Sequence, residues 1–269
     1  MKLKIAVRIL GHKAPDLDTS ALLAWRSELW EIYEKKIDTF PLNGDCDLEH
    51  WGYSDEGLSE RAVAASGADF TIYILNVPLE ANYYFRRISR NVGCVSLFEV
   101  TEVLRSHNIP VENLVLRMLY NSTMIRLRKG FLPPISELAT LAHHETKGCI
   151  FDMTGIKTDI VFSSDRPILC ESCRVGAGED RVSKETIETF SKEIKRIKKR
   201  LYYRITDWVK RQPILALAAS AFFALVLGIL GSLIASAIYD GIKKNEPNKA
   251  VEPMPTAVTD AAAQPPRQQ

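Results

Sequence analysis

The segment from Pro213 to Tyr239 constrains this chain more than any other, because it contains no charged residue. As a helix rising about 1.5 Å per residue it would reach roughly 40 Å, which exceeds the hydrocarbon core of a bilayer. A soluble helix of this length normally keeps a polar face. The segment therefore predicts a single transmembrane helix at 213–239, and its position in the chain excludes a signal peptide.

Basic residues are concentrated on the N-terminal side of this span. They are Lys195, Arg196, Lys198, Lys199, Arg200, Arg204, Lys210 and Arg211, whereas Lys243, Lys244 and Lys249 follow the span. The positive-inside rule thus predicts a single-pass protein of the inner (plasma) membrane with its N-terminal domain in the cytoplasm. Residues 240–269 are rich in Pro, Ala and Gln and are expected to form a disordered tail on the other side.

Small residues recur every fourth position within the span, at Ala224, Gly228, Ser232 and Ser236. This spacing places them on one face of a helix, where another helix can approach closely. The pattern favours self-association through the membrane helix.

Residues 183–212 have apolar side chains at alternating steps of three and four, beginning with Ile187 and Phe190. With Ser183 as a suitable N-cap, this spacing predicts one long, basic, amphipathic juxtamembrane helix. Its apolar stripe could form a coiled-coil seam, pack on the chain's own domain, or lie along the lipid surface. Its basic face would attract anionic headgroups beside the membrane.

The cysteines indicate a metal site. Structural disulfides are uncommon in the cytoplasm, so a cysteine cluster there favours metal binding. Cys170 and Cys173 have the two-residue spacing of a zinc knuckle, and Cys149 lies at a distance typical of the other half of a ligand set. His144, or alternatively His143, supplies the fourth ligand. Four protein ligands leave no open position, which predicts structural rather than catalytic zinc. Bound iron, a redox dithiol, or a buried Cys149 beside an incidental CxxC are the alternatives.

The same region, residues 143–173, resembles the structural zinc segment of the archaemetzincin family of zinc peptidases. His144, Cys149, Cys170 and Cys173 fall near the spacing of that segment, with His144 where the family has a cysteine. His143 would stand at the last histidine of the family's catalytic HExxHxxGxxH motif. The ten preceding residues, "PPISELATLA", contain no histidine, so the resemblance implies the metal and not the peptidase activity.

The N-terminal part alternates between strand and helix patterns. Strands are expected at 4–10, 69–75 and 93–100, the last running into a helix, and further helices at 21–36 and 111–128. This alternation predicts an α/β or α+β fold, in which a sheet is covered by helices. We expect a single layered domain at 1–130, with a zinc-knuckle segment at 131–182 packed on it.

A mixture of aromatic and guanidinium groups in "YYFRRISR" suggests a ligand site. Its candidate residues are Tyr84, Arg86, Arg87 and Arg90. Arginine pairs with phosphate and aromatic rings stack on bases, so a small nucleotide or phosphate is the expected ligand. The alternative is the end of an ordinary helix.

Two acidic clusters could also bind a metal or take part in hydrolysis. They are "DCDLEH" at 45–50, which also suits a solvated turn, and the group of His12, Asp16 and Asp18 after the first strand.

No serine triad, P-loop or Rossmann fingerprint is present, which favours a role other than catalysis. The net charge of +2 argues against nucleic acid as a partner; membrane lipid and a second copy of the chain are the expected partners instead. The order of segments predicts a membrane-anchored sensor or effector, of a bacterial stress or phage-defence kind, that signals through assembly of its membrane helix. A membrane-tethered metal-dependent hydrolase and a membrane recruitment scaffold are the alternatives.

Overall fold

The structure is a computed structural model that describes residues 2–138, 141–144 and 146–245. The chain forms two compact units, of which the first ends at Thr206 and the second begins at Asp207. Of the tail expected at 240–269, residues 240–245 belong to a helix, and residues 246–269 lie outside the described part of the chain.

A six-stranded sheet forms the centre of the first unit. Its strands are β1 (Leu3–Leu10), β2 (Trp30–Ile32), β3 (Thr39–Phe40), β4 (Phe70–Leu75), β5 (Phe85–Ser89) and β6 (Val92–Ser96). They are ordered β2-β1-β4-β6-β5, with β3 also paired to β1. All pairs are parallel except β5 with β6. The strands expected at 4–10, 69–75 and 93–100 correspond to β1, β4 and β6, and the mixed α/β fold class is confirmed.

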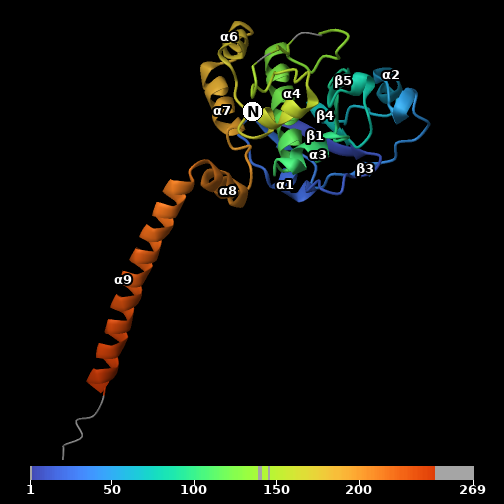
Figure 1. Ribbon diagram of the computed structural model, residues 1–269. Helices are drawn as coiled ribbons and strands as arrows, with labels where there is room; N and C mark the ends of the chain where they lie inside the picture. Colours follow the sequence, from blue (N-terminus) through green and yellow to red (C-terminus); the bar gives the residue numbers. More distant parts are fainter. Residues whose placement is uncertain (1, 139–140, 145, 246–269) are drawn as a thin grey trace, which may run out of the picture. The chain divides into compact units, whose positions relative to one another are not determined.

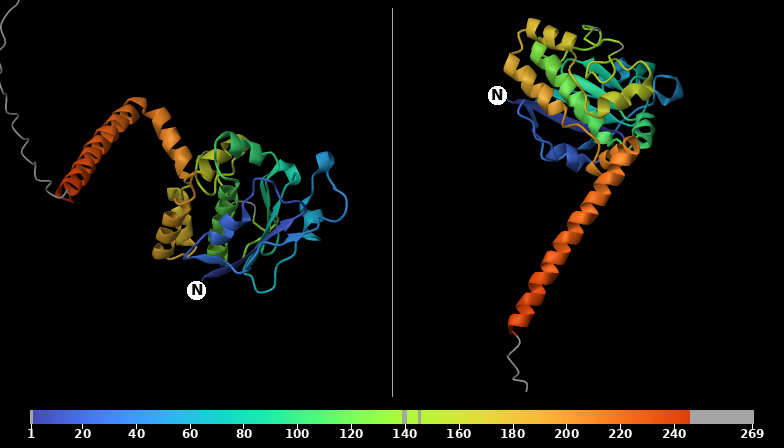
Figure 2. Two further views of the ribbon diagram at one scale, coloured as in Figure 1. Left: turned by 90° about the horizontal axis from the view of Figure 1, so that it is seen from below. Right: turned by 60° about the vertical axis from the view of Figure 1, so that its left-hand side comes forward.

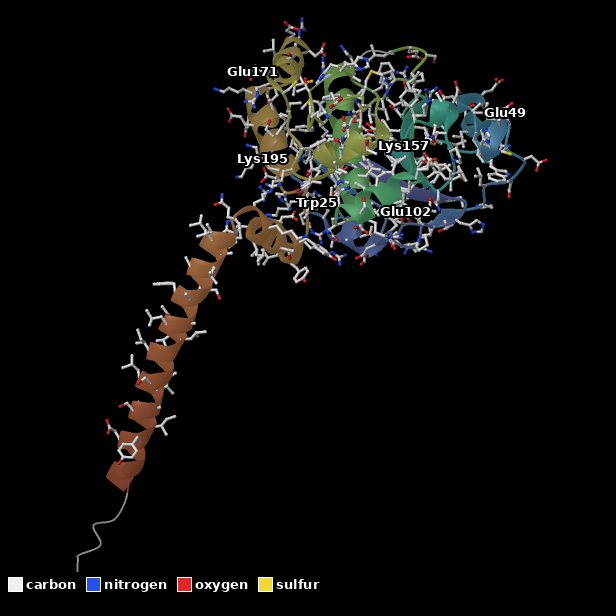
Figure 3. All side chains as sticks on the ribbon, in the orientation of Figure 1. Trp25, Glu49, Glu102, Lys157, Glu171 and Lys195 are labelled. Atoms are coloured by element: carbon white, nitrogen blue, oxygen red, sulfur yellow. The ribbon has the colours of Figure 1, made fainter. Side chains whose placement is uncertain are left out.

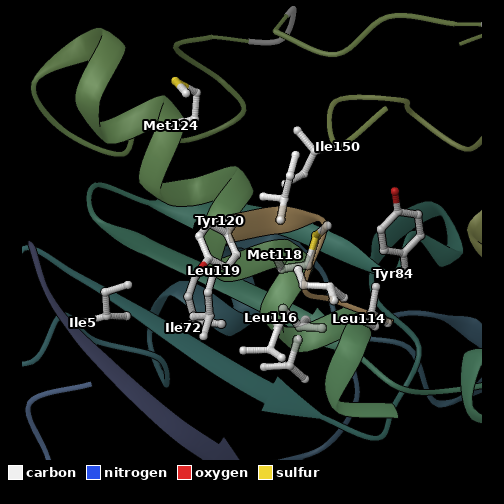
Figure 4. Close-up of a cluster of buried hydrophobic side chains, with 14 of the residues drawn as sticks. Ile5, Ile72, Tyr84, Leu114, Leu116, Met118, Leu119, Tyr120, Met124 and Ile150 are labelled. Carbon is white, nitrogen blue, oxygen red and sulfur yellow. The ribbon is translucent and has the colours of Figure 1, made fainter. Parts of the chain in front are cut away.

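The central strands β1, β4 and β6 are covered on both faces, which explains why they are mostly apolar. All six residues of β4 are buried. Ile72 and Ile74 belong to the larger core on one face, and Tyr73 and Leu75 to a smaller core on the other. Continuous apolar runs are typical of parallel strands covered on both sides. Figure 4 shows part of the larger core, in which Ile72 lies near Leu119.

Most helices of the first unit cover the face with the larger core. They are α1 (Thr19–Ala24), α3 (Val100–Ser106), α4 (Val111–Lys129), α5 (Ile160–Ser164), α6 (Glu171–Glu179) and α7 (Lys184–Ile194). Helix α4 is central and contacts α1, α3, α5 and α7 (Figures 1 and 2). The short helix α2 (Asp55–Ser59) packs against β5, and its Leu58 belongs to the smaller core.

Helix α4 confirms the helix expected at 111–128. It follows Pro110 and ends at Gly130, whose φ of 79° is accessible to glycine without steric cost. Every residue from Val111 to Ile125 is buried, including several polar ones. This helix is therefore surrounded by other elements instead of presenting one face to solvent.

The helix expected at 21–36 is wrong beyond residue 24. Asp18 caps α1 by accepting hydrogen bonds from the backbone N–H groups of Ser20 and Ala21. After this short helix, Trp30 begins β2 opposite Leu3 of β1 and is almost completely buried. The apolar spacing resembles that of a helix, but pairing with a distant strand determines the local structure.

The single long helix expected at 183–212 is also wrong, because residues 195–200 separate α7 from α8 (Leu201–Arg211). The backbone of this break is hydrogen-bonded to Asp165 and Arg166, which lie earlier in the chain. Arg166 donates its N–H to the carbonyl of Ile197 at 2.6 Å, and the N–H of Lys199 is bonded to Asp165 Oδ1 at 3.0 Å. These contacts hold the chain out of a helical path.

The two halves of this segment differ in burial. In and just after α7, which Ser183 caps as expected, the apolar residues Ile187, Phe190, Ile194 and Ile197 are buried in the first unit's core. They are therefore not available as a coiled-coil seam. In α8, by contrast, Leu201, Ile205 and Trp208 are exposed.

The second unit consists mainly of helix α9 (Pro213–Asn245). The most apolar window of 18 residues within 213–240 has a mean hydropathy of 2.5, and none of it is buried. Figure 3 shows that its side chains are almost entirely carbon. The helix is long and apolar enough to cross a membrane.

Candidate metal centre and ligand cavity

Four metal-binding side chains converge in the first unit: His143, Cys149, Cys170 and Cys173. Their ligand atoms all lie within 4.8 Å of one another. Cys149 and Cys173 are buried, whereas His143 and Cys170 are partly exposed. This group of four residues is called the metal cluster below.

Helix α6 supplies two of the thiols. Cys170 is the N-cap of the helix and Cys173 lies in its first turn, so the CxxC spacing brings both side chains to the same end of the helix. The positive end of the helix dipole favours ionised thiols at this position.

Cys149 is positioned by a tight turn and by a backbone pairing. The N–H of Cys149 is bonded to the carbonyl of Thr146, and Gly148 within this turn has a φ of 91°. The following N–H, of Ile150, donates to the carbonyl of Ile168 at 2.9 Å. Since Ile168 comes shortly before α6, this pairing brings Cys149 to the two thiols of the helix.

The histidine of the cluster is His143, the alternative in the sequence prediction, and not His144. The backbone N–H of His143 donates to Phe151 O, and its carbonyl accepts from the N–H of Met153, so the chain is extended here. Successive side chains of an extended chain point to opposite sides. His143 consequently faces the thiols, whereas His144 is exposed to solvent.

The distances within the metal cluster fit a four-coordinate ion. His143 Nε2 lies 3.3 Å from Cys149 Sγ and 3.4 Å from Cys170 Sγ, and the Sγ atoms of Cys149 and Cys173 are 3.8 Å apart. Tetrahedral bonds of about 2.0–2.3 Å place ligand atoms about 3.5–3.8 Å apart. The four residues could therefore hold a metal ion and would occupy every position of a tetrahedral site.

The thiols differ in acidity. The hydrogen bond between the Cys149 and Cys173 side chains lowers the pKa of Cys149 to about 4. The same bond, together with burial, raises the pKa of Cys173. The cluster thus already favours a thiolate at Cys149, which is the form that binds metal.

The expected ligand residues of "YYFRRISR" lie in and beside β5, and not at the end of a helix. Arg86 forms an ion pair with Asp55, its Nε lying 2.8 Å from Oδ1. Tyr84, Arg86 and Arg87 line a cavity of about 250 Å³. Arg90 is not part of that lining, and its guanidinium stacks on the ring of Phe131.

Helix α4 contributes residues to this cavity that the sequence analysis did not single out, above all Arg117 and Asn121. Arg117 interrupts the apolar run "LVLRMLY" and is completely buried. The signal in the sequence was a lone arginine inside an apolar run. A charged residue at such a position is rarely buried without a partner, so it indicates a candidate binding residue.

The two acidic clusters do not assemble into a site. Asp16 pairs with Arg105, and Asp18 caps α1. Asp47 accepts hydrogen bonds from Ser54, as in a solvated turn. His12 is exposed. Among the described residues, the four members of the metal cluster are the group of His, Cys, Asp and Glu side chains arranged to hold a metal ion.

Comparisons with protein families, with curated proteins and with solved structures find no match to this chain. The functional argument therefore rests on its own residues.

Proposed function

We propose that this protein is a membrane-anchored, zinc-stabilised sensor whose first unit lies in the cytoplasm. The observation that carries the membrane anchor is the apolar stretch 213–240, none of which is buried. Exposure of so long an apolar helix to water is unfavourable, whereas the hydrocarbon core of a bilayer accommodates its apolar side chains. The basic residues before this helix, which exceed those after it, support the cytoplasmic location.

Zinc is the proposed ion of the metal cluster. Three thiols and one imidazole form a ligand set that zinc prefers, and the cluster's ligand-atom separations suit its tetrahedral geometry. A closed set of this kind holds chain segments together and leaves no position for substrate.

Helix α8 provides a second observation that supports membrane attachment. Its exposed Leu201, Ile205 and Trp208 lie at helical spacing on one face, and Arg204 and Lys210 add positive charge. An amphipathic helix with these properties binds at the surface of a bilayer with anionic lipids. We place α8 at the cytoplasmic surface, directly before the spanning helix.

The sensing part of the proposal is supported by the cavity of the first unit and by the small residues of α9. Ligand binding in the first unit would change the association of copies through the face of Ala224, Gly228, Ser232 and Ser236. Bacterial stress or phage defence is the setting that we propose, on the basis of a cytoplasmic unit joined to one membrane helix. No specific observation favours the hydrolase alternative.

Association of the full chain in liposomes tests this proposal, measured by energy transfer between labelled copies. Gly228→Leu with Ser232→Leu blocks close approach of helices and should abolish the transfer. Ala219→Leu with Ala237→Leu is the matched control, since a helix of 3.6 residues per turn places both positions opposite Gly228. Equal transfer in both variants would contradict assembly through this face. Deletion of 213–240 should also move the protein from the membrane to the soluble fraction.

A further inference from the structure

The cavity beside β5 lies between three parts of the chain. Tyr84 and Arg87 come from β5 and the residue before it, Arg117 and Met118 from α4, and Ile150 from the loop of the metal cluster. Figure 4 labels Tyr84, Met118 and Ile150 among the buried residues on the α4 side of the sheet. Its volume of about 250 Å³ is far more than the roughly 10–15 Å³ that a single water requires. It has room for a small organic molecule.

Arg117 is the most unusual residue of the lining, because no carboxylate among the described residues forms an ion pair with it. It is completely buried. Its Nη1 donates to the hydroxyl of Tyr84 at 3.0 Å and its Nη2 to the carbonyl of Asp152 at 3.1 Å, while its Nε has no partner among the described residues. Buried charges in proteins are normally paired, because an isolated one loses its hydration without compensation.

Arg87 is a second buried guanidinium on the same lining. It is 6% exposed and donates to the backbone carbonyls of Pro133 and Leu138. Among the described residues no carboxylate forms an ion pair with it. Burial lowers the pKa of Arg87 to about 10, so the side chain is still charged at neutral pH.

The remaining charged groups leave the cavity positive. Arg86 forms ion pairs with Asp55 and Glu80, both of which lie outside the lining. Asp152 is the carboxylate on the lining, and its Oδ1 accepts the N–H of Thr154. Within the described lining, one carboxylate therefore stands against two guanidinium groups that form no ion pair with a described residue.

We propose that this cavity binds a small organic anion, whose carboxylate or phosphate group pairs with Arg117 and whose apolar body lies against Met118, Ile150 and Phe151. This inference rests on the proposed sensing function, for which it names the class of ligand. A guanidinium binds either anionic group through charge-assisted hydrogen bonds. The apolar part of the lining disfavours inorganic phosphate alone, because a body of the right size gains from burial.

The test is calorimetric titration of the full chain in nanodiscs with four probes. Phenyl phosphate and benzoate carry the two anionic groups on an aromatic body, inorganic phosphate lacks the body, and benzyl alcohol lacks the charge. Saturable binding of phenyl phosphate or benzoate is expected, with the stronger of the two identifying the anionic group. Inorganic phosphate and benzyl alcohol should bind at least about tenfold more weakly. Failure of both aromatic anions to bind would overturn the proposal.

Variants assign the binding to this cavity. Arg117→Met should weaken the binding of the better aromatic anion by about tenfold or more, whereas Arg90→Met, a loss of arginine outside the lining, should leave it unchanged. Met118→Phe fills the cavity without removing a charge and should also abolish binding, which decides the matter if Arg117→Met does not fold. Unchanged binding in Met118→Phe would overturn the proposal. Binding without any change of association in liposomes would instead contradict the sensing function and leave the cavity assignment intact.

Discussion

Asn121 of α4 donates a hydrogen bond of 3.1 Å from its side-chain amide to the carbonyl of Ile150, the residue that follows Cys149 of the metal cluster. Asn121 is itself buried, and both residues line the cavity. The bond joins the wall supplied by α4 to the wall supplied by the metal cluster's loop. The shape of the cavity should therefore depend on the bound ion.

Removal of the ion should abolish anion binding in the cavity. Chelation would remove the link that an ion makes between the side chains of the cluster, so that the loop with Ile150 and Phe151 would be attached to the segment before α6 only through its backbone pairing with Ile168. Titration of the better aromatic anion before and after chelation measures the effect, and readdition of zinc should restore binding. Full binding to the chelated protein, with metal loss verified by elemental analysis, would show that the two sites are independent.

The two adjacent histidines provide a matched pair of variants. His143→Ala removes one of four ligands and should weaken metal binding by about tenfold or more, whereas His144→Ala changes an exposed side chain and should not. Competition with a zinc-binding dye measures the affinity of each purified variant. Metal loss in His144→Ala alone would reverse the assignment.

Much of the sheet could be predicted from sequence, because its strands are continuous apolar runs. The same holds for α4, since Pro110 and Gly130 mark its ends. The region around Trp30 could not be predicted, because its strand exists only through pairing with β1. The break after α7 depends on contacts from Asp165 and Arg166, which no local pattern reveals.

The candidate sites could likewise be predicted from the sequence only in part. The spacing of Cys170 and Cys173 identified the cluster, but the choice of His143 over His144 required the direction of an extended chain. For the cavity, two neighbouring arginines of β5 were identified from sequence, whereas Arg117 comes from an element thirty residues later. Convergence of distant segments is a property of the fold and not of any local pattern.

Glu193 should be important for attaching α7 to the rest of the first unit. Its buried carboxylate accepts hydrogen bonds from the Ser27 hydroxyl at 2.6 Å, the Glu28 N–H at 2.6 Å and the Tyr120 hydroxyl at 2.7 Å. Glu193→Ala leaves these donors unsatisfied and should lower the free energy of unfolding by about 3 kcal/mol or more. Chemical denaturation of the full chain in micelles measures it.

The control for this variant is Glu188→Ala on the same helix. Glu188 is largely exposed and lies near Lys184 at the surface, so its removal should change the stability by less than about 0.5 kcal/mol. Equal effects of the two substitutions would contradict the structural role of Glu193.

Tyr120 predicts a dependence of stability on alkaline pH. Burial, with a smaller effect of the neighbouring Glu193, raises the pKa of Tyr120. The folded protein therefore keeps this proton at a pH at which the unfolded chain, with an ordinary tyrosine pKa of about 10, has lost it. The stability that the protonated Tyr120 contributes is fully present below the unfolded-state pKa of about 10. It is lost as the pH rises from there towards the raised pKa of the folded state.

Tyr120→Phe removes the titrating group. Between about pH 9 and pH 11 the unfolding free energy of this variant should fall less steeply than that of the wild type. Tyr202→Phe is the control, because Tyr202 is highly exposed. Identical slopes for wild type and Tyr120→Phe would contradict the buried, protonated state of Tyr120.

The most direct measurement is the zinc content and X-ray absorption spectrum of the full chain purified in detergent micelles, because the central claim is a closed zinc site that holds the first unit together. We predict one zinc per chain with three sulfur ligands and one nitrogen ligand, lost in Cys170→Ser and retained in Cys46→Ser, which lies outside the cluster. A chain free of metal, or a zinc ion with a water ligand in place of one of these side chains, would contradict the account.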